Sequence, residues 1–563
     1  MTDRRQPNTE HRTSVFDPSR NPAVLDTATW DRAAAWSAVK RTGERWAAAR
    51  EGGSVGGGVT AYGGSAVRRG SATFLLVGLP DGQQVFVELG RGGAALGEPL
   101  GELTLKNGLR VAAYPTDAAV VDRYCRVLRP HNRPRALGAT PRLGVGCRMT
   151  TSVWPGMFEA MRRGNFAANT IQNSVRELNF LADLRAARPA PANYACGFGT
   201  IETGYTGSTW EGLWVAGVLA ALQNPMPVRY GADADHLQVK RGASGFARAK
   251  RLAKAARYYT FYTLDMADIL DYSGRERRLS DSREQRMVMA YHRQPLRMGH
   301  RRHALDERAV GRLIGKYWDA LEALTELGDH ISRLKGGEAF DLEFTIDEHP
   351  PEVAAFACLT TAEELCFVLR EIRRRGLPVT HVAPNFGQEK GWDYRCPDGL
   401  AGLEKRVGEQ AAMADAFGVM LDVHSADDLS RPVRRVIRRA TRGRVHYKIS
   451  PSLQLLFAAT LADHDPRLFH EWWEDARAYA RREAQAGSAF AAECLLADGV
   501  GEPAPSPHHR VFHHFSFAFV GRRDKAGRFM NRDRFYALPD AFQRDYTGRL
   551  AARLCGLAKD LFE

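Results

Sequence analysis

Eight short apolar segments alternate with longer helical patterns between residues 140 and 450 of this 563-residue chain. Each segment has the length of a buried strand, and the stretch that follows is long enough for a crossover helix. The expected strands are 143–147, 168–172, 227–231, 258–264, 340–346, 379–384, 419–424 and 445–449. The clearest expected helices are 309–334, 361–375, 403–417 and 428–439. Eight parallel strands, each followed by a helix, predict an α/β fold of the TIM-barrel type, a (β/α)8 domain.

A doubly wound sheet is the alternative fold, but the Gly-rich fingerprint that follows the first strand of such folds is absent. The chain before the barrel divides into two parts. Residues 1–25 are polar without periodicity and predict a disordered tail. Residues 26–138 predict a small α+β domain, because two apolar runs there flank the turn Leu79-Pro-Asp-Gly82. Residues 139–563 form the predicted TIM-barrel-like domain with a C-terminal helical extension.

Composition narrows the function classes. The chain carries a net charge of +14, but its arginine runs at 373–375 and 431–442 lie on helix-like stretches without interleaved aromatic residues. We interpret them as solvated helix faces and expect no nucleic-acid partner. No stretch approaches the roughly 18 apolar residues of a membrane span, and no apolar segment follows the first arginines, so we expect a cytoplasmic protein without a membrane partner. Eight scattered cysteines without a C-x-x-C pair predict reduced thiols.

Strand parity shows where the polar residues converge. In the seventh strand Asp422 and His424 share one face, while Leu421 and Val423 share the other. The same division into a polar and an apolar face recurs along the other strands. The polar face carries Gln172 and Ser174 in the second strand, Asp233 and Asp235 after the third, Thr263 and Asp265 in the fourth, Glu343, Thr345 and Asp347 in the fifth, and His446 and Lys448 in the eighth. We expect this face to point into the barrel and towards its mouth.

This set of carboxylates and imidazoles is suited to a divalent metal such as Zn²⁺, Mn²⁺, Fe²⁺, Co²⁺ or Ni²⁺, whose identity the sequence leaves open. The predicted metal ligands are Asp235, Glu343, His424 and His446. The catalytic candidates are Glu177, Asp265, Asp347 and Lys448. The substrate-binding candidates are Gln172, Ser174, Arg176, Asp233, His236, Asn385 and Lys390. Each has a structural alternative: His446 could be a hydrogen-bonded core histidine, and Lys448 could pair with Asp422 or Glu343.

The segments at the strand ends together resemble the tagaturonate epimerase family of hexuronate metabolism. The matching segments are Gln172–Glu177, Gly231–His236, Thr263–Asp265, Glu343–Glu348, Glu389–Tyr394, His424-Ser425 and His446–Lys448. The resemblance implies a metal-dependent, TIM-barrel-like epimerase that interconverts tagaturonate and fructuronate at C4. It also implies that Asp235, Glu343 and His424 are the main metal ligands, with His446 behind them.

Two loops depart from the family pattern. The family continues the seventh-strand histidine as His-Ser-Gly-Ser-Asp-Lys, whereas this chain reads His424-Ser-Ala-Asp-Asp-Leu429. A Gly-Thr-Ser-like loop follows the eighth strand in the family, but here the sequence is Ile449-Ser-Pro-Ser452. Such loops are suited to binding anions, because backbone N–H groups and lysine hold carboxylates well. The substrate could therefore differ while the metal chemistry persists.

Inversion at C4 of a 2-ketose needs more than enolisation, because the C4 proton is not adjacent to the ketone. A retro-aldol route fits: a base removes the C4 hydroxyl proton, the C3–C4 bond opens, and the aldehyde rotates before re-addition. The resemblance implies a small acidic sugar as the binding partner. We also allow for a homo-oligomer. One alternative is a metal-dependent aldolase or isomerase on another acidic sugar. The other is a non-catalytic carbohydrate-binding sensor.

Overall fold

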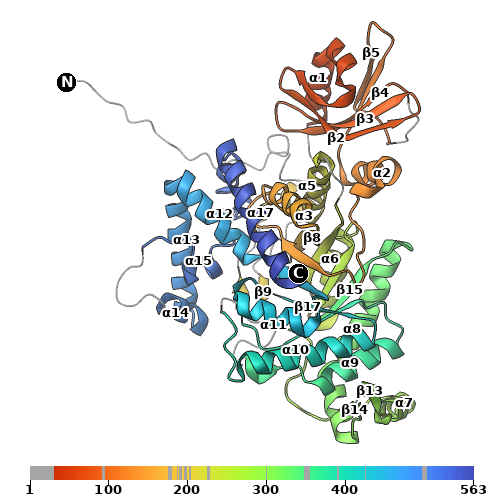
Figure 1. Ribbon diagram of the computed structural model, residues 1–563, viewed down its shortest axis with the longest axis vertical. Coiled ribbons are helices and arrows are strands. Elements are labelled where there is room, and N and C mark those ends of the chain that lie inside the picture. The colour runs from red at the N-terminus through yellow and green to blue at the C-terminus, as the bar shows by residue number, and fades with distance from the viewer. Residues whose placement is uncertain are drawn as a thin grey trace, which may run out of the picture.

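A closed barrel of eight parallel strands forms the centre of the molecule (Figure 1). The computed structural model describes residues 31–91, 96–174, 180–186, 188, 193–195, 199–201, 204–224, 228–298, 301–347, 355–389, 392–424, 426–496 and 504–563. The barrel strands are β7 (Arg142–Gly146), β8 (Ala167–Ser174), β11 (Tyr230–Gln238), β12 (Phe261–Asp265), β15 (Asp341–Ile346), β16 (His381–Pro384), β17 (Met420–Val423) and β18 (Val445–Ile449). They follow one another in chain order, and β18 pairs with β7. The TIM-barrel prediction is confirmed, and closure excludes the doubly wound sheet.

The extent of the third strand was predicted wrongly. The sequence interpretation ends it at residue 231, whereas β11 runs from Tyr230 to Gln238 and contains the whole acidic segment. Ala232 and Ala234 alternate with Asp233 and Asp235, and all four are buried. Alternation directs the alanines towards the covering helices and the aspartates into the barrel, so the acidic run is itself a strand pattern. The other seven strands begin and end within three residues of their expected bounds.

Helices cover the outside of the barrel, one after each strand (Figure 1). They are α3 (Val153–Gly164), α5 (Trp210–Gln223), α6 (Gly242–Ala255), α8 (Glu307–Lys335), α9 (Ala362–Arg374), α10 (Gly399–Ala416), α11 (Arg431–Thr441) and α12 (Pro451–His464). In α11 the side chains of Val433, Val436 and Ile437 are buried, and most of its arginines occupy the remaining faces. Arg434 is an exception to the predicted solvated face, because it is buried and pairs with Asp560 at 2.8 Å. Helix α9 begins with a capping box between Thr361 and Glu364.

The N-terminal part forms a six-stranded antiparallel sheet in the order β1-β2-β3-β4-β6-β5. Its strands are β1 (Gly53–Gly56), β2 (Val59–Arg69), β3 (Ala72–Gly78), β4 (Gln84–Leu89), β5 (Gly101–Thr104) and β6 (Arg110–Tyr114). One face packs with α1 (Arg32–Thr42) and the 3-10 helix η3 (Gly43–Glu51) around the buried Trp46. The other face packs with α2 (Ala118–Leu128) and with α5 of the barrel domain. Because α5 is covered by this sheet as well as by β8, it is apolar on all sides. The tail at 1–25 lies outside the described residues.

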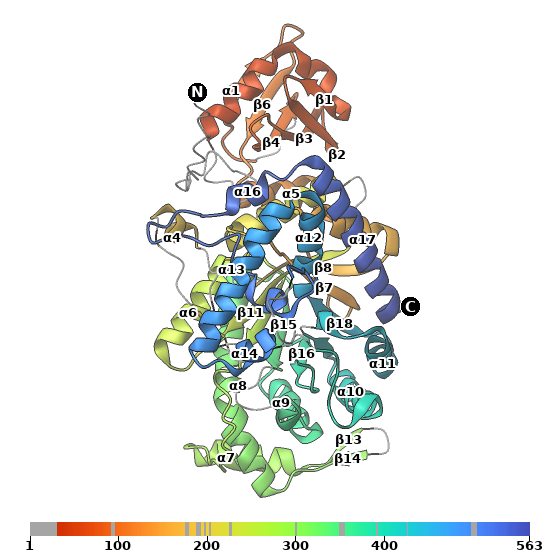
Figure 2. The same cartoon turned by 90° about the vertical axis from the view of Figure 1, so that its left-hand side faces the viewer.

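A helical extension follows the barrel, and its longest helix, α17, runs beside α3 and α12 (Figures 1 and 2). The extension comprises α13 (Pro466–Gln485), α14 (Ala489–Leu496), α15 (Arg510–Phe515), α16 (Arg532–Tyr536) and α17 (Asp540–Phe562). The short helix η4 (Pro130–Asn132) precedes the barrel. Smaller elements in the connections of the barrel are α4 (Leu181–Arg185), β9 (Asn193–Ala195), β10 (Gly199–Ile201), α7 (Ser282–Arg293), β13 (Leu296–Met298), β14 (Arg301–His303), η5 (Ala355–Cys358) and η6 (Ala426–Asp428). Of the helices in the described residues, none has the length and apolarity to cross a membrane. The seven cysteines among the described residues are free thiols, as expected.

Candidate active site

The barrel interior holds three layers of polar side chains, stacked along its axis. The lowest layer contains His381 at the start of β16 and His446 in β18. His446 Nδ1 lies 2.9 Å from Asp422 Oδ2, and Arg142 Nη2 lies 2.8 Å from His381 Nε2. The guanidinium of Arg142 is also 3.2 Å from Asp341 Oδ2. Burial, together with the charge of Arg142, lowers the pKa of both histidines well below its usual value, so they are neutral here.

The middle layer is built around the ammonium group of Lys448, whose side chain is only 3% exposed. Its Nζ donates to Glu343 Oε2 at 2.6 Å, to Thr263 Oγ1 at 2.6 Å and to Asp235 Oδ1 at 3.0 Å. The carboxylate of Asp233 completes the cluster, with Oδ2 at 3.3 Å from Nζ. Strands β11, β12, β15 and β18 thus each contribute one or more side chains to one buried cluster, as strand parity predicts.

The upper layer lies at the carboxyl ends of the strands, where TIM barrels carry their active sites. His424, directly after β17, approaches Glu343 with Nε2 at 2.6 Å and Asp347 with Nδ1 at 3.3 Å. Beside it, His236 Nδ1 lies 3.1 Å from Asp265 Oδ2, and the rings of His236 and His424 are 4.9 Å apart. With 17% of its side chain exposed, His236 is the residue of this layer that reaches towards the mouth.

The charges of this cluster depend on one another. Burial would lower the pKa of Lys448, but the carboxylates of Asp233, Asp235 and Glu343 hold it well above its usual value. Burial likewise opposes ionisation of Glu343, yet the cations of His424 and Lys448 hold its pKa well below the usual range. For Asp233 burial prevails and raises the pKa to about 7. The ordinary charge states are therefore a cationic Lys448 and an anionic Glu343, with Asp233 close to its titration point at neutral pH.

The upper layer fits a divalent cation. Glu343, Asp422 and His424 offer ligand atoms that all lie within 4.8 Å of one another. The buried ring nitrogens of His424 lie at ion-pair distance from Glu343 and Asp347 but without hydrogen-bond geometry, and among the described residues the buried Oδ1 atom of Asp422 has no hydrogen-bond partner. Burial would lower the pKa of His424, but Glu343 and Asp347 raise it well above the usual value. The lower set of His381, Asp422 and His446 fits less well, because the guanidinium of Arg142 already contacts His381.

A family model described as UxaE, tagaturonate epimerase, matches residues 198–554, which is more than half of the chain. The chain belongs to the tagaturonate epimerase family. Tagaturonate/fructuronate epimerase of Thermotoga maritima is 26% identical over 283 residues, 48% of this chain and 54% of that protein. The chain thus spans about half the length of this curated relative.

The solved structures of fructuronate-tagaturonate epimerase UxaE from Cohnella laeviribosi share the fold. The native structure has a TM-score of 0.69 and 21% identity, and the similarity covers 93% of this chain and 99% of that one. Its complex with one glycerol has a TM-score of 0.67 and 20% identity, and the similarity covers 94% and 99% of the two chains. The predicted family and its TIM-like barrel are therefore confirmed.

Not every predicted site residue of this tagaturonate epimerase family member joins the cluster. Asn385 is buried behind β16, where Oδ1 accepts the N–H of Gly387 at 2.8 Å and Nδ2 lies 3.4 Å from the Ala355 carbonyl, so its side chain shapes the loop. Ser174 ends β8 in register with Asp235, next to the cluster. The backbone of Gln172 pairs with that of Asp233. Glu177, Arg176 and Lys390 lie outside the described residues.

The two altered loops contact each other, and an acid of the first loop lies on the backbone amides of the second. Asp427, in the loop after β17, accepts the N–H of Ser450 at 2.8 Å and of Ser452 at 2.9 Å. These amides lie at the N-terminus of α12, so its helix dipole is already met by a carboxylate. Sequence reasoning missed this role of Asp427, and it considered Asp422 only as a partner of Lys448. Parity did place Asp422 on the polar face, and this was the available signal.

Proposed function

We propose that this chain is a metal-dependent epimerase that interconverts tagaturonate and fructuronate, or a closely related acidic ketose, at C4. The observation that carries the proposal is the convergence of Glu343, Asp422 and His424 beside the Lys448 cluster at the carboxyl end of the barrel. Family membership supports it, because the relatives with this fold bear the names of tagaturonate and fructuronate epimerases.

We assign the divalent cation to Glu343, His424 and Asp422, with Asp235 beside them. Asp422 takes the place that the sequence interpretation gave to His446. His446 Nδ1 is 2.9 Å from Asp422 Oδ2, so His446 orients Asp422 from below. Asp347, 3.3 Å from His424 Nδ1, orients the histidine from the other side. When bound, the cation would polarise the ketone and stabilise negative charge on the sugar oxygens.

His236 and Asp265 supply the proton transfer in this proposal. The carboxylate of Asp265 lies 3.1 Å from His236 Nδ1 and fixes the ring, which leaves Nε2 directed away from that contact. Although burial alone would lower the pKa of His236, Asp235 and Asp265 raise it, so the imidazole binds a proton more readily than a free histidine does. His236 removes the C4 hydroxyl proton, C3–C4 opens, the aldehyde turns, and re-addition returns the proton with C4 inverted.

Lys448 holds charge in this reaction. Its ammonium faces the cluster from below with hydrogen bonds to Thr263 and Glu343, both at 2.6 Å, and thereby offsets the negative charge of the carboxylates. Its raised pKa keeps Lys448 protonated, so it does not serve as the base.

The test is incubation of the purified chain, loaded in turn with Mn²⁺, Zn²⁺, Ni²⁺, Co²⁺ or Fe²⁺, with tagaturonate and with fructuronate. We expect NMR spectra to show each substrate approach the same mixture of C4 epimers, and we expect H236N and E343Q to abolish this. Release of a three-carbon fragment would instead identify an aldolase. Tight sugar binding without turnover under every metal would identify a sensor and contradict the proposal.

A further inference from the structure

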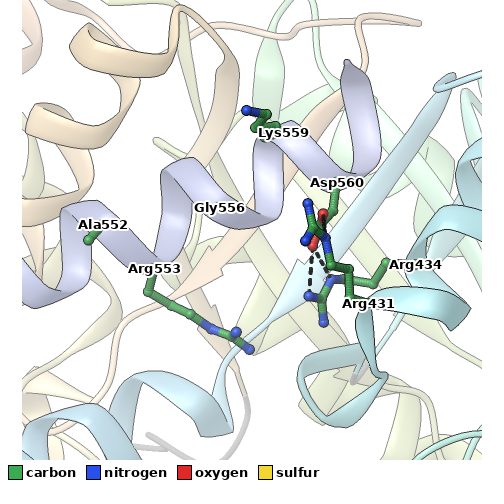
Figure 3. A pocket seen from close by; sticks show the side chains of 7 residues that line it. All are labelled: Arg431, Arg434, Ala552, Arg553, Gly556, Lys559 and Asp560. Carbon is green, nitrogen blue, oxygen red and sulfur yellow. Dashed lines mark hydrogen bonds and ion pairs between the residues drawn. The ribbon is translucent and has the colours of Figure 1, made fainter.

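A pocket of about 270 Å³ lies on the outside of the barrel, between helices α11 and α17 (Figure 3). The residues that line it are Arg431 and Arg434 of α11 and Ala552, Arg553, Gly556, Lys559 and Asp560 of α17. Four of these side chains are cations and one is a carboxylate, so the lining has an excess of three positive charges. None of the lining residues belongs to the candidate active site, so this excess is not part of the metal or substrate site.

The single acid of the pocket is already paired. Asp560 is buried, and its carboxylate accepts from Arg431 Nε and from Arg434 Nη2, both at 2.8 Å. Figure 3 shows both guanidinium groups gathered at this carboxylate. Arg434 has no donor left over, because its Nε also lies 3.2 Å from Asp560 and its Nη1 donates to the Leu429 carbonyl. Asp560 therefore compensates the charge at one end of the pocket only.

The other donors of the pocket face no carboxylate. Arg553 reaches out from α17 on the far side of Gly556 (Figure 3), and its Nη2 lies 3.3 Å from the Asp427 carbonyl oxygen, a neutral acceptor. In the part of the chain that the structure describes, Lys559 Nζ and the two Nη groups of Arg431 meet no hydrogen-bond or ion-pair partner. The space between them is open, since a Cβ atom added to Gly556 would meet no atom within 4 Å.

Charge and size together select the ligand. A phosphate group carries a charge of about −1.5 to −2 at pH 7 and three acceptor oxygens, so it can meet donors from both helices at once. A single carboxylate would compensate only one of the three excess charges. Pockets for drug-sized ligands begin at roughly 300 Å³, so a pocket of about 270 Å³ suits a phosphate group with a few carbon atoms.

The pocket also touches the loop that follows the seventh strand of the barrel. Arg553 holds this loop at the Asp427 carbonyl, and Arg434 holds it at the Leu429 carbonyl. The same loop begins at His424, one of the proposed metal ligands. A phosphate is a stronger partner for a guanidinium than a neutral carbonyl at 3.3 Å, because charge-assisted hydrogen bonds are shorter and stronger. A phosphate in the pocket would therefore draw Arg553 away from the loop.

We propose that the pocket between α11 and α17 is a regulatory site for a small phosphorylated metabolite, which takes Arg553 from the Asp427 carbonyl and thereby loosens the loop after His424. Binding and the loosening of the loop can both be measured without turnover. Only the consequence for the reaction rests on the proposed function.

Calorimetric titration at low salt, with inorganic phosphate and with glycerol 3-phosphate, tests the site. We expect both to bind the native chain, and K559Q to bind them about five- to tenfold more weakly, because one charged donor is lost. D560N removes the competing negative charge and keeps the shape, so it should bind at least about threefold more tightly. Lactate, which offers a carboxylate in place of phosphate, should bind the native chain at least about tenfold more weakly. R435Q is the matched control, because Arg435 is an exposed arginine of the same helix that does not line this pocket.

Hydrogen exchange followed by mass spectrometry tests the effect on the loop. Saturating glycerol 3-phosphate should speed the exchange of the amides of residues 426–430 in the native chain and leave helix α8 unchanged. R553Q should show the faster exchange without ligand, and glycerol 3-phosphate should not increase it further. Without ligand, K559Q should exchange like the native chain, since Lys559 does not contact the loop.

Several outcomes would overturn the proposal. If the native chain binds no phosphate, or if it, K559Q and R435Q give identical titrations, the pocket is not the site. Lactate binding as tight as that of phosphate would contradict the ligand class, and phosphate binding with unchanged exchange at 426–430 would contradict the regulatory effect. If D560N does not fold, K559Q decides, because Lys559 is exposed on the helix surface. Phosphate binding as expected by a chain that does not epimerise either sugar would remove only the proposed function.

Discussion

Replacement of Lys448 by methionine removes the single ammonium group from the middle layer of the barrel. The native Nζ lies 2.6 Å from Glu343 Oε2, 3.0 Å from Asp235 Oδ1 and 3.3 Å from Asp233 Oδ2, and its side chain is 3% exposed. Removal of one partner from a buried ion pair costs about 3–5 kcal/mol. Because one lysine here serves several carboxylates, we expect K448M to lose about 4–5 kcal/mol of unfolding free energy at pH 8, at the upper end of that range.

The cost should shrink as the pH falls. Burial raises the pKa of Asp233 to about 7 even beside Lys448, and without the ammonium the carboxyls of this cluster titrate at still higher pH. A carboxyl whose pKa is raised by folding favours the folded state below its unfolded value near 4, and this contribution is lost as the pH rises through the folded value. The native chain and K448M should therefore differ less at pH 5.5 than at pH 8.

Urea unfolding followed by circular dichroism, with EDTA present so that no added cation compensates, measures this difference. K335M is the matched control, because Lys335 is also a buried lysine but donates to the carbonyls of Tyr259 at 2.7 Å and Arg257 at 3.2 Å, away from the cluster. Burial lowers the pKa of Lys335 to about 8, so its charge is poorly compensated and its removal should cost no more than about 1–2 kcal/mol. The reasoning fails if K448M is as stable as K335M at pH 8, or if its loss does not depend on pH.

Three further changes test separate parts of the site. H424Q should lose the bound divalent cation, whereas H446Q should retain most of it, because His446 is expected to orient Asp422 and not to bind the ion. Elemental analysis after dialysis measures the metal content of both variants. Equal loss of metal would show that His446 is a metal ligand after all. His236 has a φ of +48°, in the left-handed region that asparagine tolerates, so H236N should melt at or above the native temperature. It should nevertheless lose at least about 100-fold in kcat, and native-like turnover would exclude His236 as the base. For His513, burial together with Arg148 and Arg510 lowers the pKa from 6.5 to about 4. The unfolded chain therefore binds a proton that the folded chain does not, and stability falls by up to about 3 kcal/mol as the pH drops from 6.5 to 4. H513Q should remove this part of the acid destabilisation, as melting curves at pH 7 and 4.5 would show; an unchanged pH slope would contradict it.

The sequence allowed the inward face of the barrel to be predicted, because side chains alternate along a strand whatever the strand's neighbours are. This rule brought Asp233, Glu343 and Lys448 together correctly. It did not give their heights along the barrel axis, which depend on the stagger between strands. His446 and Lys448 share a face but lie two residues apart, so they belong to different layers, and His446 meets Asp422 instead of His424. Asp427 could not be placed by alternation at all, because it lies in a loop.

His236 shows where a periodic rule fails for a local reason. Strict alternation directs it away from Asp235 and out of the barrel, yet the register of β11 against β12 shifts between Ala234 and Leu237, and His236 has a φ of +48°. A left-handed backbone at a residue with a side chain costs about 1–2 kcal/mol, so the bulge is maintained against its own strain. What the strain achieves is the contact with Asp265 and the approach to the His424 ring. Stability alone would favour a regular strand here, and the irregular one is therefore best explained by the chemistry of the imidazole that it turns towards the mouth.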